Sequence, residues 1–230
     1  DPLPLFSVLV QGTVLICQNG VLFYIYYALL MGVYLFSLFG ISDILFDLRQ
    51  SRARTLVFIV PFLGLHSAML HYGLSRVLGT EKPFLLEGGV AGQRLLGQVF
   101  QPSTFGVFLL LSLYLFLNKR PFFSLLSLAV AGSFHSVYLL SAALLTLGYL
   151  WVISREKRNI KDPALFGALA LLLVTPVLAY TFFIFKPTSM AITREVNDLL
   201  VNFRNPVHAI VANWMDWTFA VQLAMVFVAL

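Results

Sequence analysis

The chain has 230 residues, of which 60% are hydrophobic, 15% aromatic and only 11% charged, and its mean hydropathy is +0.89. A water-soluble domain carries about a quarter charged residues and roughly half apolar ones. The composition argues against a soluble enzyme, a disordered segment, a coiled coil or a nucleic-acid-binding module. It predicts an all-α polytopic membrane protein.

The chain begins with Asp1 and ends in an apolar stretch, so we expect residues 1–230 to be a single transmembrane domain from a longer membrane protein. Residues 3–18 are apolar but are interrupted at Gln11 and Gly12. This first stretch predicts a re-entrant piece or the end of a further element.

A helix that crosses the hydrocarbon layer needs about twenty apolar residues. Such spans are predicted at Val21–Phe46, Thr55–Leu78, Ser103–Leu117 and Ala164–Phe185, with a last one beginning near Trp214. Pro176 predicts a kink in the fourth of these. Together with the segment discussed next, this gives a helix bundle of about seven crossings, some short or broken.

Residues 121–154 form a run of more than thirty residues without a formal charge. Small and polar residues from Gly132 to Ser136 interrupt its middle. We predict two short helices that meet at a tight turn. The alternative is a single long, tilted helix.

The basic residues are distributed unevenly over the connections. Nine of them lie in the short connections 47–54, 118–121 and 154–162. Short loops rich in Lys and Arg face the cytoplasm, so we expect an integral protein of a bacterial inner membrane with these three connections inside. A single crossing over 121–154 would separate the second connection from the third, and the charge rule therefore favours the break.

The longer connections 79–102 and 186–213 are then the outer loops, where we expect any functional site. In the second loop, apolar side chains recur at helical spacing from Ile192 to Phe203 with polar residues between them. The spacing predicts an amphipathic helix over Met190–Phe203. We expect it to lie flat in the membrane interface, with packing over the outer mouth of the bundle as the alternative.

Arg204 and His208 follow this helix, on a predicted turn at the membrane edge. Arginine suits bidentate recognition of a phosphate, and histidine can titrate near neutral pH. The alternative is that Arg204 pairs with lipid headgroups while Trp214 and Trp217 form an aromatic belt.

The first outer loop has a glycine spacing over residues 92–97 that is similar to a P-loop. However, Gln98 stands where the motif needs Lys, Val99 replaces Ser or Thr, and no strand precedes it, so we reject nucleotide binding there. We expect Arg94, Gln98 and Gln101 to point into an outer cavity. Ser103, next to Pro102, would line the same cavity and start a helix.

His135 lies at the predicted turn between Ser133 and Ser136. It would line a cavity open to the outside, or its ring would be held by the two neighbouring hydroxyls. His66 and His71 are five residues apart, whereas zinc binding from one helix needs four. We expect His66 to bond to a neighbouring helix, and the chain to hold no metal and no cofactor.

The layout resembles the membrane module of the GT-C class of glycosyltransferases, which use polyprenyl-phosphate-linked sugars. The residues that carry the resemblance are Arg94, the His135 turn, the Met190–Phe203 helix, and Arg204 with His208. It implies that Arg94 and Arg204 bind the lipid phosphate and that His135 or His208 assists catalysis. The acidic residue of the first outer loop of that class has no counterpart in this sequence.

Short sequence motifs such as Phe100-Gln-Pro-Ser103 and Arg204-Asn-Pro-Val-His208 are also similar to those of uncharacterised bacterial polytopic proteins.

Three functions remain open at this point. The first is a glycosyltransferase-like enzyme, or its relic, that binds a polyprenyl-phosphate sugar. The second is a transporter or flippase with a site at the broken segment. The third is a non-catalytic subunit that contacts other membrane subunits and lipids.

Overall fold

A computed structural model describes residues 4–79, 96, 99–157, 159–184, 189–204, 206–215 and 217–229. These residues form helices joined by turns, and no strand occurs among them. The chain divides into two compact units, residues 1–48 with 95–185 and residues 49–94 with 186–230. The predicted all-α class is confirmed.

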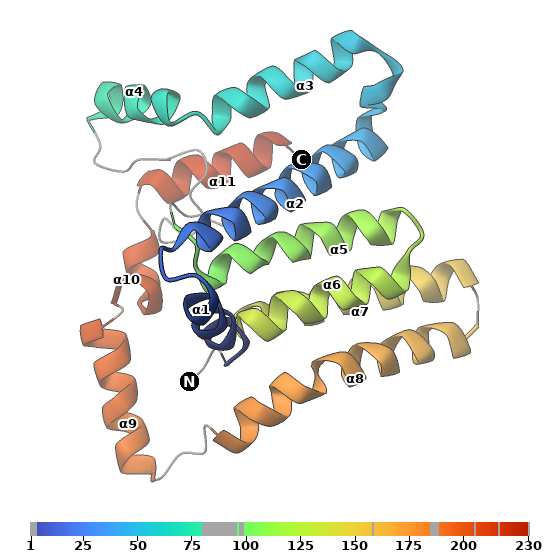
Figure 1. The fold of residues 1–230 in the computed structure, drawn as a ribbon. Coiled ribbons are helices and arrows are strands. Elements are labelled where there is room, and N and C mark those ends of the chain that lie inside the picture. Colours follow the sequence, from blue (N-terminus) through green and yellow to red (C-terminus); the bar gives the residue numbers. More distant parts are fainter. Residues whose placement is uncertain are drawn as a thin grey trace. The chain divides into compact units, whose positions relative to one another are not determined.

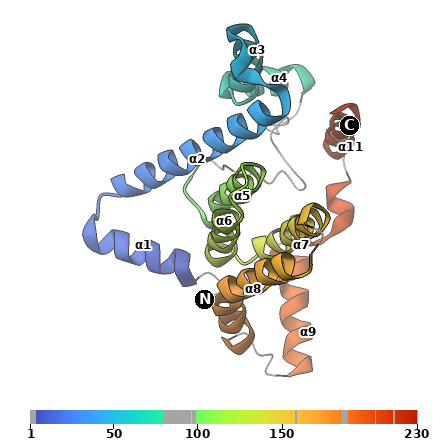
Figure 2. The same cartoon turned by 90° about the vertical axis from the view of Figure 1, so that its right-hand side faces the viewer.

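The first unit contains six helices: α1 (Pro4–Ile16), α2 (Val21–Phe46), α5 (Val107–Leu117), α6 (Pro121–Phe134), α7 (Tyr138–Lys157) and α8 (Lys161–Ile184). Helices α5 to α8 follow one another up and down with short connections, and α2 runs alongside α5 (Figure 1). Figure 2 views α5, α6 and α7 nearly along their axes. The turns before α6 and before α8 therefore lie at one end of this unit, and the turn before α7 lies at the other.

Helices α2 and α5 are parallel and in close contact. The ring of Phe23, near the start of α2, stacks on Phe100, which precedes α5, with ring centroids 5.8 Å apart. Near the other end, the backbone of Gly40 lies directly against the ring of Tyr114. The lack of a side chain at Gly40 is what lets the two helices approach there.

Buried hydroxyl groups join α5, α6 and α7 in the middle of the first unit. The Ser112 hydroxyl lies 2.9 Å from that of Ser124 and 3.1 Å from that of Tyr149. The Tyr149 ring also stacks on Phe116, with centroids 4.0 Å apart. Between apolar helices, such side-chain hydrogen bonds supply specific helix–helix contacts.

The predicted break in residues 121–154 is confirmed, because α6 ends at Phe134 and α7 begins at Tyr138. An ion pair between Lys119 Nζ and Glu156 Oε1, 2.8 Å long, holds the two basic connections at the same end. The prediction that both helices are short is wrong for α7, whose 20 residues suffice for a membrane crossing.

The second unit contains α3 (Arg52–Leu65), α4 (Ala68–Leu78), α9 (Met190–Asp198), α10 (Pro206–Ala209) and α11 (Trp217–Ala229). The predicted span Thr55–Leu78 is interrupted, because α3 and α4 meet at a bend of 58°. The hydroxyl of Ser67 accepts a hydrogen bond from the Leu70 amide and starts α4 anew. His66 closes α3, and its Nδ1 lies 2.9 Å from the Phe62 carbonyl of the same helix.

The predicted amphipathic helix is present. It starts at Ser189, whose hydroxyl accepts from the Ile192 amide at 3.2 Å, and α9 passes directly into a π-helical segment, Leu199–Arg204. The apolar side chains of Ile192 and Phe203 are exposed. This exposure is consistent with the predicted position in a membrane interface, which remains a prediction.

Among the described residues, three helices are long and apolar enough to cross a membrane: α2, α7 and α8. The bent pair of α3 and α4 would make a fourth. About seven crossings are therefore not confirmed. Helix α6 has 14 residues, which at 1.5 Å per residue give about 21 Å against a hydrocarbon layer of about 30 Å. Helix α1 runs through Gln11 and Gly12, and its predicted role as a re-entrant piece or the end of a further element stays a prediction.

Candidate functional site

The turn between α6 and α7 is built by small residues and a few backbone hydrogen bonds. The His135 amide donates to the Ala131 carbonyl at 3.0 Å, and the Tyr138 amide donates to the His135 carbonyl at 2.9 Å. A side chain at Gly132 would come within 2.8 Å of Leu139 Cδ2. Glycine at this position therefore lets the first turn of α7 fold back against the last turn of α6.

A tyrosine connects this turn to the start of α5. The hydroxyl of Tyr138 donates to the backbone carbonyl of Ser103 at 2.6 Å, within the 3₁₀ helix Pro102–Gly106 that precedes α5. The amide of Gln101 donates to the buried Thr104 hydroxyl at 3.3 Å. The structure thus brings Gln101, Ser103 and the His135 turn to one end of the first unit, which we call the His135 end.

His135 contributes a titratable imidazole to this end. Its ring meets that of Tyr138 edge to face, with centroids 5.1 Å apart, and its Nδ1 is buried without a hydrogen-bond partner among the described residues. Burial lowers the pKa of His135 below its ordinary value of 6.5. The ring is therefore neutral at pH 7, with one nitrogen able to donate and the other to accept.

The two hydroxyls that flank His135 in the sequence do not hold its ring. Neither Ser133 nor Ser136 bonds to the buried Nδ1. A buried polar atom without a partner costs about 1–3 kcal/mol, and such an atom in a native structure calls for a ligand, an ion or a water. Of the two interpretations of His135, the one in which the neighbouring hydroxyls hold its ring is therefore not supported, and the one in which it lines a cavity stays a prediction.

Aromatic rings pack beneath the turn. Phe105 stacks face to face on Phe134, with centroids 3.9 Å apart, and Phe100 lies 6.0 Å from Phe105 and 5.4 Å from Phe6. Close packing of rings from three helices and a loop fixes the position of the backbone around His135. The polar groups of this end are therefore presented from a rigid base.

The remaining predicted site residues lie outside the described residues or belong to the second unit. Arg94 and Gln98 lie outside the described residues. Arg204 is exposed at the end of the π-helical segment of the second unit, so its predicted position on a turn is wrong. His208 lies in the short helix α10 and not on a turn, and its side chain is outside the described part. A common cavity for Arg94, His135, Arg204 and His208 stays a prediction.

No metal site accompanies these residues. Within the described ranges, no group of three or more His, Cys, Asp or Glu side chains is placed to hold an ion. What the His135 end offers chemically is a neutral imidazole beside a phenol. Such a pair can donate a hydrogen bond to an anionic or hydroxyl ligand or accept a proton from it.

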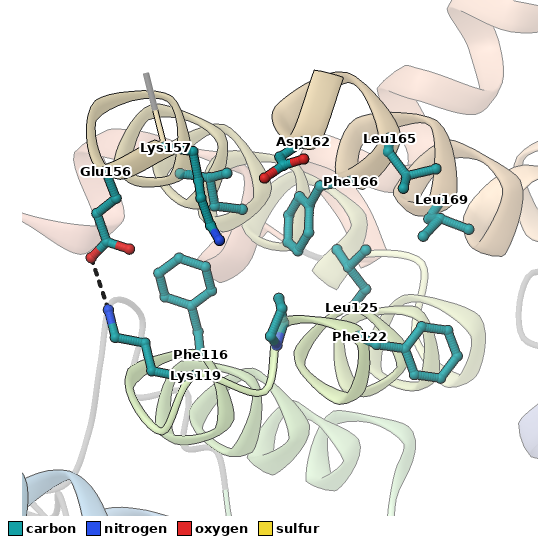
Figure 3. Close-up of a pocket in the computed structure, with 12 residues that line it drawn as sticks. Phe116, Lys119, Phe122, Leu125, Glu156, Lys157, Asp162, Leu165, Phe166 and Leu169 are labelled. Atoms are coloured by element: carbon teal, nitrogen blue, oxygen red, sulfur yellow. Dashed lines mark hydrogen bonds and ion pairs between the residues drawn. The ribbon is translucent and has the colours of Figure 1, made fainter. Parts of the chain in front are cut away.

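The sequence reasoning missed two features of the first unit. One is Tyr138, three residues after His135, whose hydroxyl could have been recognised as a polar group at the start of an apolar helix. The other is a pocket of about 480 Å³ at the opposite end, which we call the Lys119 end. Phe116, Leu125 and Phe166 point into it, and Lys119, Glu156, Lys157 and Asp162 surround it (Figure 3).

Comparison of the chain with protein-family models, with curated proteins and with solved structures finds no match. A functional assignment therefore rests on the geometry of these residues.

Proposed function

We propose that this chain is the membrane module of a protein that binds a phosphate-bearing lipid at its His135 end, in the manner of a GT-C glycosyltransferase. The observation that carries the proposal is the buried, unpartnered Nδ1 of His135 beside Tyr138 and Ser103. The three helices long enough to cross a membrane support a ligand that is itself a lipid.

The position of the α6–α7 turn along the first unit favours a site at the membrane surface. Tyr138 bonds to the loop before α5, and Phe134 stacks on Phe105 in that same loop. The turn is therefore level with the ends of its neighbouring helices. A transporter of the broken-helix kind places its site near the middle of the bilayer, so this geometry favours a lipid headgroup site over a transport site.

From the sequence, we assign the lipid phosphate to Arg94 and Arg204, because arginine binds a phosphate through two parallel hydrogen bonds. We assign a hydroxyl or phosphate oxygen of the headgroup to His135. Gln98, Gln101 and Ser103 are assigned to the lining of the site from the sequence alone. As an enzyme, the protein would break the bond between the sugar C1 and the phosphate oxygen, form a new bond from C1 to an acceptor oxygen, and pass the acceptor proton to His135 or His208.

To test the proposal, a polyprenyl phosphate is titrated into the full-length protein in detergent. Binding is measured as the shift in melting temperature. We expect stabilisation of the wild type, loss of that stabilisation in Arg204→Ala, and a weaker effect in His135→Gln. Val137→Ser is the matched control, because Val137 is an exposed residue of the same turn. Equal stabilisation of all four proteins, or of none, would remove the proposal and leave the transporter and subunit functions.

A further inference from the structure

The Lys119 end carries two charged side chains that form no ion pair with any described residue. Lys119 is paired with Glu156. Neither Lys157 nor Asp162 has an ion-pair partner in the described part of the chain. In Figure 3 both side chains point toward the interior of the pocket. The pocket therefore presents one cation and one anion to a ligand.

The position of Asp162 is fixed by its backbone. The Asp162 amide donates to the side-chain oxygen of Asn159 at 2.9 Å, which starts α8 (Lys161–Ile184) next to the end of α7. Lys157 is the last residue of α7. The short connection therefore holds the two charges at adjacent helix ends, where the basic connections predict the cytoplasmic surface of the membrane.

Below this rim the pocket is apolar. Phe116 from α5, Leu125 from α6 and Phe166 from α8 form its walls. Its volume of about 480 Å³ lies within the range of about 300–1,000 Å³ usual for ligand sites. An apolar interior with charges only at the mouth fits an amphiphile better than a free ion.

A second cavity of about 420 Å³ shares one lining residue, Leu125, with this pocket. It is lined by Leu, Ala, Val and Thr side chains and by Gly167, all from α6, α7 and α8. Along α7 it extends from Leu139 to Leu150, about 16 Å at 1.5 Å per residue. A groove of this length between transmembrane helices suits an acyl chain.

We propose that the Lys119 end binds a phospholipid with a zwitterionic, primary-amine headgroup, of the phosphatidylethanolamine type. Lys157 binds the phosphate and Asp162 accepts hydrogen bonds from the ammonium, while an acyl chain occupies the groove past Leu125. A headgroup with only negative charge would give Asp162 no cationic partner and would place a like charge beside it. A quaternary ammonium has no N–H to donate to Asp162.

The experiment compares three phospholipids that have identical acyl chains and carry ethanolamine, glycerol or choline headgroups. Each lipid is titrated into the full-length protein in detergent, and binding is measured as the shift in melting temperature. We expect the ethanolamine lipid to bind about tenfold more tightly than the other two, which is the effect of one hydrogen bond to a charged group. Asp162→Asn should abolish this preference, and Lys157→Gln should weaken binding of all three lipids.

Arg155→Gln is the matched control, because Arg155 is a basic residue of α7 that lies over the Trp151 ring and does not line the pocket. It should bind as the wild type does. A wild type that prefers the glycerol lipid, that does not distinguish the three headgroups, or whose preference survives Asp162→Asn would overturn the proposal. Stabilisation by polyprenyl phosphate, measured on Asp162→Asn, should be unchanged, which separates this site from the one at the His135 end.

Discussion

Single residues at the two ends of the first unit decide what each end can bind. At the His135 end the important atoms are a buried ring nitrogen and a tyrosine hydroxyl committed to a backbone carbonyl. At the Lys119 end they are an ammonium and a carboxylate without partners in the described part of the chain. Hydrogen bonding and charge, more than shape, therefore distinguish the two proposed ligands.

Acidification should destabilise the protein through His135. Burial lowers its pKa below 6.5 in the folded state, so the unfolded state binds more protons once the pH falls to that range. The contribution to stability is present above about pH 6.5 and is lost as the pH falls below it. We expect the melting temperature to fall between about pH 7.5 and pH 5.5, and to fall less in His135→Gln. An identical decline in both proteins would contradict a buried neutral ring.

Removal of the Tyr138 hydroxyl should loosen the His135 end. Tyr138→Phe leaves the Ser103 carbonyl without this donor, which costs about 1–3 kcal/mol for a group shielded from water. Tyr24→Phe removes the same atom from an exposed position on α2 and should change the melting temperature little. If both substitutions had the same effect, the Tyr138 bond would not fix the turn.

Whole elements were predictable where one local signal dominated. The span Val21–Phe46 agrees residue for residue with α2, because a long, mostly apolar run ends at Asp47. The break at Gly132–Ser136 followed from the charge rule. By contrast, the bend at His66 and Ser67 was missed, since average hydropathy does not register a serine that caps a new helix.

Contact between α2 and α5 depends on Gly40, and this can be tested with a pair of equivalent substitutions. A side chain at Gly40 would overlap the Tyr114 ring, whereas one at Gly32 would meet nothing within 4 Å. We expect Gly40→Ala to lower the melting temperature. Gly32→Ala should leave it unchanged or raise it, because alanine is favoured over glycine in a helix by about 1 kcal/mol. Equal effects at the two positions would argue against this close contact.

At the scale of the whole molecule, the sequence predicted an all-helical chain with helices apolar enough to cross a membrane, and two basic connections, 118–121 and 154–162, at one end of the first unit. It could not predict which side chains meet. The bond from Tyr138 to Ser103 depends on the register of α5 against α6 and α7. The pocket at the Lys119 end was missed because its charged residues were interpreted only as topology signals.

The central claim is that the His135 turn and the Lys119 end face opposite sides of the membrane. The most direct test is labelling of single cysteines with a membrane-impermeant maleimide in sealed vesicles of known orientation, in a Cys17→Ala background. Suitable sites are Lys119→Cys, Val137→Cys and Ile160→Cys, which are all exposed. We predict that Val137→Cys is labelled from the outer side, and Lys119→Cys and Ile160→Cys only from the cytoplasmic side. Labelling of Val137→Cys and Ile160→Cys from the same side would contradict the account.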